Sequence, residues 1–121
     1  MNTTVLNNYK IDFQFLSNIN EAIVKQTILT DLGYLISIFL IEHPYVNYLN
    51  NEIIPQINNA LNNGTIDDFQ RGDSVILTIG KTNSNFTYTG ISTKNVSIPT
   101  IDLKEIILSW IEFLTNHGII K

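Results

Sequence analysis

The sequence predicts an α+β domain with two N-terminal helices, a three-stranded antiparallel meander and a C-terminal helix packed on the sheet. Three observations lead to this prediction. Apolar residues recur at helical spacing between residues 18 and 62, short runs rich in β-branched and aromatic residues follow between 74 and 98, and a broad apolar face returns after Pro99. The 121 residues contain no repeat or linker, so we expect a single domain over residues 1–121.

The first predicted helix begins near Asn18 and ends before Pro44. Asn18 and Glu21 have the spacing of a capping box, in which two side chains bind the free amides of the first helical turn. An apolar stripe follows at helical spacing, formed by Ile28, Leu32, Leu35, Ile36, Phe39 and Leu40. Residues 34–41 are also rich in β-branched and aromatic side chains, so a buried strand after Gly33 stays open as an alternative to the helix that we favour.

The second predicted helix covers residues 45–62. Its apolar residues share one face and are Val46, Leu49, Ile53, Ile54, Ile57 and Leu61. Pro55 falls inside this helix, where a proline costs about 3 kcal/mol, so we expect a kink or a break near residues 51–54. Gly64 follows two asparagines and is expected to end the helix in a left-handed cap.

The second half of the chain predicts the sheet and the last helix. Residues 74–79 and 86–91 form a hairpin pattern around a polar turn at 80–85, and a third strand is expected at 95–98. Asp102 and Glu105 again have capping-box spacing. The apolar face behind them consists of Leu103, Ile106, Ile107, Trp110, Phe113 and Leu114, and Gly118 is expected to end the helix.

Composition and motifs exclude several kinds of site. The chain has no cysteine, which rules out disulfides, thiol nucleophiles, iron–sulfur clusters and the usual structural zinc sites. Seven basic and eleven acidic residues give a net charge of −4, which disfavours non-specific binding to nucleic acid or to an anionic membrane. The sequence has no phosphate-binding glycine loop, dinucleotide fingerprint or nucleophile elbow. We therefore expect no enzymatic activity, no cofactor and no metal.

The two histidines and the apolar segments carry no signal for catalysis or targeting. His43 and His117 each fall where a predicted helix ends, a position that the helix dipole favours for histidine, so we interpret both as structural. The most apolar run, residues 34–41, is far shorter than the ~20 residues that span a bilayer. The first residues lack the basic and apolar stretches of a signal peptide. We expect a cytoplasmic protein.

A first group of candidate partner-binding residues surrounds the predicted helix junction at Pro44. It consists of Glu42, Tyr45, Tyr48 and Glu52. Tyrosine beside carboxylate is the composition of many interface hot spots, so these residues predict a binding surface. The alternative for the two tyrosines is that they pack over the junction between the helices.

A second group consists of Asp67, Asp68 and Asp73, which flank Arg71 before the first strand of the meander. We interpret them as an acidic patch that meets a basic partner or as a weak cation site, with a solvated turn as the alternative. Residues 1–60 carry two basic and five acidic groups, net −3, and residues 61–121 carry five and six, net −1. The acidic face is therefore expected in the helical half. A strand edge at 83–91 could instead accept a partner strand by β-augmentation.

The C-terminal third resembles the tail of small bacterial immunity proteins, the antidotes of polymorphic toxin and contact-dependent growth inhibition systems. The likeness lies in a hairpin with polar turns, a strand closed by Pro99, and an acidic helix that ends in Trp110, Phe113 and Leu114. Small size, acidity and the lack of cysteine are similar too. The resemblance implies a monomer or weak homodimer that neutralises a cognate toxin domain, often a basic nuclease, by stoichiometric occlusion. From the net charge of −4 we expect no direct contact with nucleic acid.

Two other classes stay open. A cytosolic secretion chaperone for an effector is also small, acidic and α+β, and a stable homodimer without cargo would distinguish it. A small-molecule binding protein or an enzyme would need a buried polar pocket that holds one of the two histidines beside a carboxylate of perturbed pKa.

Overall fold

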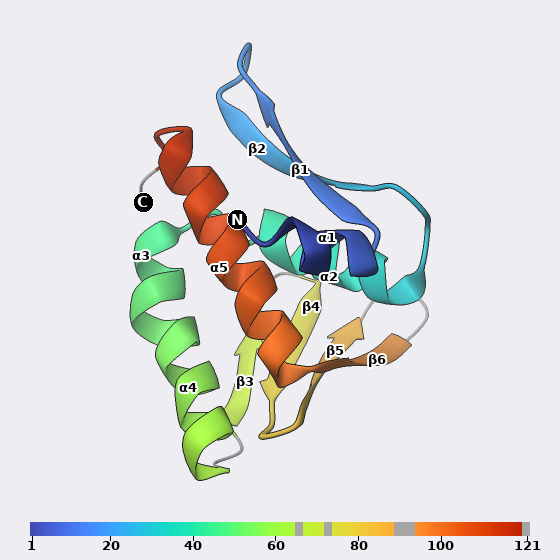
Figure 1. Ribbon diagram of the computed structural model, residues 1–121, viewed down its shortest axis with the longest axis vertical. Coiled ribbons are helices and arrows are strands. Elements are labelled where there is room, and N and C mark those ends of the chain that lie inside the picture. Colours follow the sequence, from blue (N-terminus) through green and yellow to red (C-terminus); the bar gives the residue numbers. More distant parts are fainter. Residues whose placement is uncertain (65–66, 72–73, 89–93, 120–121) are drawn as a thin grey trace.

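The computed structural model describes residues 1–64, 67–71, 74–88 and 94–119, with the backbone alone at 67–71 and at Lys94 (Figure 1). Along the chain the elements are α1 (Thr3–Asn8), β1 (Ile11–Leu16), β2 (Glu21–Gln26), α2 (Asp31–Ile41), α3 (Val46–Tyr48), the π-helical turn η1 (Leu49–Ile53), α4 (Ile54–Asn63), β3 (Asp67–Arg71), β4 (Val75–Ile79), β5 (Asn83–Tyr88), β6 (Lys94–Pro99) and α5 (Thr100–Asn116). The predicted α+β class is confirmed.

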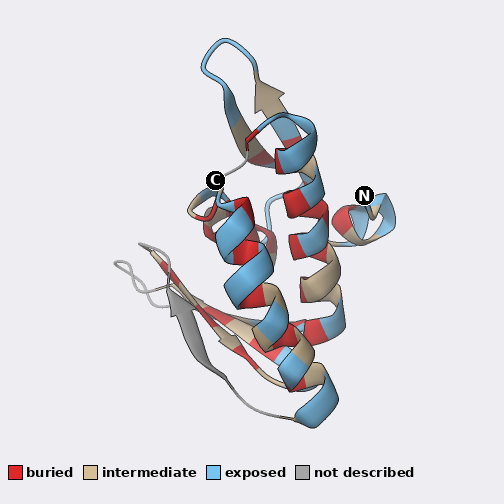
Figure 2. Ribbon diagram, turned by 90° about the vertical axis from the view of Figure 1, so that its left-hand side faces the viewer, coloured by how far each residue is buried: buried red, intermediate tan, exposed pale blue. Residues whose placement is uncertain are grey.

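The main body has two layers. Strands β3, β4, β5 and β6 form an antiparallel sheet in that order, and helices α2, α4 and α5 cover one of its faces. Figure 2 shows the buried residues between these two layers. The strands β1 and β2 form a separate antiparallel hairpin that extends beyond the body.

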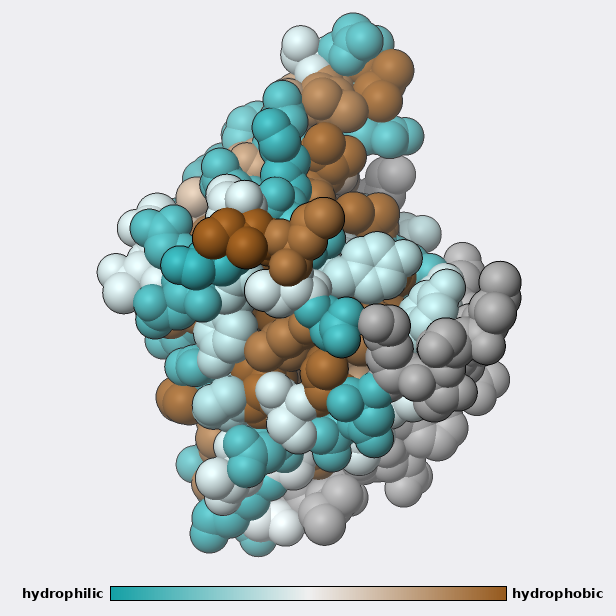
Figure 3. Space-filling view, turned by 90° about the vertical axis from the view of Figure 1, so that its right-hand side faces the viewer, coloured by the Kyte–Doolittle hydropathy of each residue, from teal (hydrophilic) through white to brown (hydrophobic). Residues whose placement is uncertain are grey.

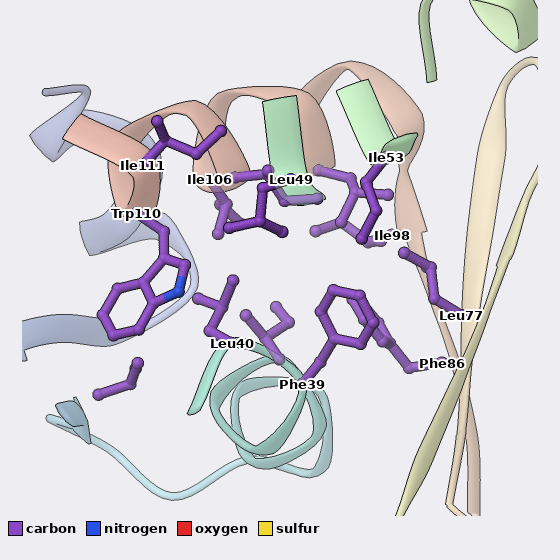
Figure 4. Packing of buried hydrophobic residues seen from close by; sticks show 14 of the residues in the cluster. Phe39, Leu40, Leu49, Ile53, Leu77, Phe86, Ile98, Ile106, Trp110 and Ile111 are labelled. Carbon is purple, nitrogen blue, oxygen red and sulfur yellow. The ribbon is translucent and has the colours of Figure 1, made fainter. Parts of the chain in front are cut away.

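The core fills the space between the helices and the sheet. Figure 4 shows Phe39 of α2 and Phe86 of β5 facing one another, and their ring centroids lie 5.6 Å apart in an edge-on contact. Trp110 of α5 is fully buried, and its indole N–H donates to the carbonyl oxygen of His43 at 3.1 Å. Phe13 of the hairpin packs against the same indole, 5.0 Å between centroids, and so joins the hairpin to the core.

The predicted first helix is wrong over residues 18–30. Glu21 is the first residue of β2 and pairs with Leu16 of β1, so Asn18 lies in a hairpin turn and caps no helix. In the partner strand β1 burial alternates, with Ile11 and Phe13 buried and the residues after each exposed, so one face of the hairpin packs on the core. Asn20 adopts the left-handed conformation, with φ 54°, that the tight turn requires.

Residues 34–41, for which the sequence allowed either a helix or a strand, lie in helix α2, so the favoured helix is confirmed. Its N-cap is Thr30, whose Oγ1 accepts the N–H of Gly33 at 2.9 Å. Gly33 lies inside the helix because a side chain does not fit: an added Cβ would lie 2.9 Å from Thr30 Oγ1 and 3.2 Å from the carbonyl oxygen of Tyr9. The glycine thus brings the start of α2 close to the start of the hairpin.

The second predicted helix runs from Val46 to Asn63 as α3, η1 and α4. The expected irregularity before Pro55 is the wider π-helical turn η1. In an α-helix the proline ring would clash with the carbonyl four residues earlier, and a π-turn relieves this crowding. Gly64 ends α4 with φ 68°, which confirms the predicted left-handed cap.

The predicted meander is confirmed as β4, β5 and β6, with differences at its ends. The strand edge expected at 83–91 is wrong over 83–88, because β5 pairs with β4 on one side and with β6 on the other. Strand β5 begins at Asn83, inside the expected turn, and residues 89–91 of the expected strand lie outside the described residues. The sheet also has a fourth strand, β3, which the sequence did not indicate because Asp67–Arg71 lacks a β-branched residue.

The last helix confirms its predicted end and corrects its predicted start. Helix α5 begins at Thr100, so Asp102 lies in its first turn and does not cap it. The Asp102 carboxylate instead accepts a hydrogen bond from the hydroxyl of Tyr9. Thr100 Oγ1 donates to the carbonyl oxygen of Gly80 at 2.7 Å, which ties the helix start to the end of β4. Gly118, with φ 74°, follows the helix as expected.

Candidate functional site

The junction between α2 and α3 is a corner built around His43. This histidine is 5 % exposed, and its Nδ1 lies 2.7 Å from the carbonyl oxygen of Phe39, to which it donates when protonated at that nitrogen. The imidazole stacks on the Phe39 ring at 4.2 Å and on the Tyr48 ring at 6.0 Å. With the bond from Trp110 to its carbonyl oxygen, His43 joins α2, α3 and α5, as the structural interpretation expected.

The first group of predicted binding residues lies around this corner. We call Glu42, Tyr45, Tyr48 and Glu52 the corner surface. Tyr45 is 45 % exposed, Tyr48 is 37 % exposed, and Glu52 is exposed, so three of the four face solvent. Tyr45 stands at the N-cap of α3 and Tyr48 at its end, one helical turn further on.

Two members of the corner surface also have a structural role. Glu42 is half-buried, and its Oε1 accepts the backbone N–H of Ser74 at 3.2 Å, which ties the end of α2 to the start of β4. Tyr48 covers one face of the His43 ring. Burial raises the pKa of Tyr48 above its ordinary value, and the negative charge of Glu52 raises it further. Tyr48 therefore stays neutral and remains a hydrogen-bond donor at neutral pH.

The side chains of the second group of predicted residues are not among those that the structure describes. Asp67 and Asp68 lie on β3, where the structure describes the backbone alone. Asp73 lies outside the described residues. Their roles as an acidic patch or a cation site therefore stay predictions.

The helices from α2 to α4 carry acidic side chains and no basic ones. From Gln26 to Gln70 the sequence has no lysine and no arginine, and its acidic residues are Asp31, Glu42, Glu52, Asp67 and Asp68. This stretch contains the whole of α2, α3, η1 and α4. These helices therefore contribute negative side-chain charge to the corner and no positive side-chain charge.

A groove that the sequence did not indicate lies between the hairpin and the helical corner. Its volume is about 220 Å³, and its lining residues are Asn20, Glu21, Ala22, Ile23, Ile41, Pro44 and Ile119. They come from the turn and first half of β2, from the end of α2 and from the segment after α5. The groove was missed because the hairpin was predicted as helix.

A second hollow, about 550 Å³ and open to solvent, lies where β2 leads into α2. It is lined by Gln26, Leu29, Thr30, Asp31 and Tyr34. Leu29 is 83 % exposed, and Figure 3 shows apolar side chains exposed on the side of the molecule that carries this connection. Gln26 Oε1 is buried there without a hydrogen-bond partner among the described residues.

His117 and Tyr9 make structural contacts, and the described residues hold no cluster of potential metal ligands. No three His, Cys, Asp or Glu side chains in this part of the chain are grouped to hold a metal. His117 caps α5, with Nδ1 2.9 Å from the carbonyl oxygen of Phe113, and its ring lies against Phe15 at 4.6 Å. Burial, and then the hydrogen bond to Asp102, raise the pKa of Tyr9 well above its ordinary range. No described helix is long and apolar enough to cross a membrane.

Searches against protein-family models, curated proteins and solved structures found no match to this chain.

Proposed function

We propose that this chain is a cytoplasmic immunity protein that binds a cognate toxin domain, a basic nuclease, and neutralises it by stoichiometric occlusion. The observation that carries the proposal is the corner surface, where exposed tyrosines stand beside carboxylates on a stretch of chain without a single lysine or arginine. The likeness of the C-terminal third to immunity proteins points in the same direction.

The chemistry of the corner surface suits a nuclease in particular. A nuclease carries a positive surface that binds the phosphates of its substrate, and an acidic inhibitor is drawn to the same surface. Charge speeds the encounter, whereas buried aromatic anchors supply most of the binding energy. Tyr45 and Tyr48 are the candidates for those anchors, and Glu52 for the steering charge. No catalytic group of the inhibitor is needed.

Co-expression with the protein encoded immediately upstream tests the proposal. We expect that protein to stop growth when expressed alone, and to be captured with this chain in a one-to-one complex that restores growth. A stable homodimer of this chain, together with a neighbour that is not toxic and is not captured, would contradict the proposal and favour a secretion chaperone.

Two variant pairs then locate the interface. We expect Tyr45→Ala and Glu52→Lys each to raise the Kd of the complex about tenfold or more at low salt, a loss of about 1.4 kcal/mol. Tyr34→Ala is the control for Tyr45→Ala, because Tyr34 is 44 % exposed and lies at the other end of α2. Glu105→Lys is the control for Glu52→Lys, because it makes the same charge change on α5, outside the corner surface. If the controls weaken binding as much as the test variants, the corner surface is not the interface.

A further inference from the structure

We propose that the groove between β2 and the α2–α3 corner receives an apolar side chain carried on a basic segment of the partner. That the occupant belongs to a partner rests on the proposed function. The inference adds which part of the partner this chain would recognise.

The shape of the groove is set by three elements. After α5, the left-handed Gly118 turns the chain back, and the N–H of Ile119 bonds to the carbonyl oxygen of Leu114 at 2.9 Å. Ile119 is thereby 7 % exposed and contributes to the lining. In Figure 1 the end of α5 lies between the hairpin and α3. Ile23 of β2 and Ile41 of α2 add apolar surface, and Ile41 is 44 % exposed although it lines the groove.

The size of the groove fits one side chain better than a small molecule. Its volume, about 220 Å³, is below the range of roughly 300–1,000 Å³ that is usual for small-molecule pockets. Protein interfaces, in contrast, often place a single apolar anchor in a pocket of the partner and surround it with polar contacts. An exposed isoleucine beside such a pocket is apolar area that an inserted side chain would bury.

The charged groups at the groove favour a basic segment around that anchor. Glu21 lines the groove at the hairpin side and is exposed, and the wall formed by Ile41 and Pro44 belongs to the stretch from Gln26 to Gln70 that has no lysine or arginine. Lys25 of the same strand lies opposite Asp12 in the β1–β2 register and does not line the groove. Lysine or arginine residues beside the anchor would therefore meet the Glu21 carboxylate, and acidic residues there would be repelled. A second copy of this chain fits poorly, since each copy carries a net charge of −4.

The test is an NMR titration of the full, ¹⁵N-labelled chain with the peptide acetyl-KKFKK-amide. We expect saturable amide shifts centred on residues 20–23, 41–43 and 119, with a Kd of about 1 mM for a single anchor. The peptides QQFQQ and KKGKK, which lack the charges and the anchor respectively, should each bind at least about fivefold more weakly. Shifts scattered over the acidic residues of the whole surface, or equal binding of the control peptides, would overturn the proposal.

The variant Ile41→Asp separates insertion from simple charge attraction. It removes apolar wall and adds a negative charge, so it weakens the peptide complex if the anchor enters the groove and strengthens it if charge alone binds the peptide. Ile101→Asp is the matched control, because Ile101 is 54 % exposed on α5 and is not part of the lining. A variant that ends at residue 119 tests whether the chain's own last residues occupy the groove. Peptide binding that appears only after residues 120–121 are removed would assign the groove to them and overturn the proposal.

The same variants distinguish failure of this inference from failure of the proposed function. If the toxin is captured and silenced equally well by wild type and by Ile41→Asp, the immunity function stands and the groove has no part in it. If the peptide binds as expected but the neighbouring protein is neither toxic nor captured, the groove keeps its binding chemistry and the immunity function falls.

Discussion

Replacement of Gly33 by alanine tests the packing that places α2 against the hairpin. In an ordinary helix interior this change stabilises the protein by up to about 1 kcal/mol, because alanine is the better helix former. Here the new Cβ would lie 2.9 Å from Thr30 Oγ1 and 3.2 Å from the Tyr9 carbonyl oxygen, distances at which a neighbour must move. Movement of Thr30 weakens a helix cap that is worth about 1 kcal/mol, and overpacking costs a further 1–3 kcal/mol or so.

We therefore expect Gly33→Ala to lower the free energy of unfolding by about 1–3 kcal/mol. Urea unfolding followed by far-ultraviolet circular dichroism measures it. A double-mutant cycle with Thr30→Ala identifies the cause, because the penalty of Gly33→Ala should shrink by about 0.5 kcal/mol or more once Oγ1 is gone. A Gly33→Ala protein as stable as wild type, or more stable, would refute the reasoning, and α2 would then not be held close to the hairpin by this glycine.

Three further predictions concern single side chains. In the unfolded chain Tyr9 loses its proton at about pH 10, whereas in the folded chain its pKa is higher. The contribution of Tyr9 to the free energy of unfolding is therefore fully present below about pH 10 and is lost as the pH rises above it. Urea unfolding measured between about pH 9 and 11 should show a shallower loss of stability in Tyr9→Phe than in wild type. Lys10 has φ 58°, so Lys10→Gly should raise the melting temperature by relieving about 1 kcal/mol of backbone strain, whereas Asn20→Gly should gain less because asparagine tolerates this conformation. Glu42→Gln keeps the acceptor for the Ser74 N–H and should change stability by less than about 0.5 kcal/mol, while Glu42→Ala should cost about 1 kcal/mol in the same unfolding assay.

The C-terminal half could be predicted from the sequence because its patterns are local. Val75, Leu77 and Ile79 alternate as a half-buried strand must, and the periodicity from Leu103 to Leu114 matches one long helix. The N-terminal half could not, since Asn18 and Glu21 have the spacing of a capping box although they lie in the hairpin, and Ile28 extends the apolar spacing of α2 into the segment before it. Strand β3 was missed because its pairing with β4 compensates for a sequence with little strand preference of its own.

The candidate site could be predicted only where its residues are neighbours in the chain. Glu42, Tyr45, Tyr48 and Glu52 fall within a few helical turns, so the break at Pro44 was enough to bring them to one corner. The groove beside them joins residues of β2, α2 and the end of the chain, and no local pattern connects such distant segments. It depends on the hairpin, which is the element that the sequence analysis assigned wrongly.

The growth of cells that co-express the upstream protein with a double variant of this chain tests the central claim most directly. We expect Tyr45→Ala with Glu52→Lys to lose protection although the chain remains folded, and Tyr34→Ala with Glu105→Lys to protect as wild type does. Full protection by the first double variant, or equal loss in both, would contradict the claim that this chain neutralises a basic partner through its helical corner.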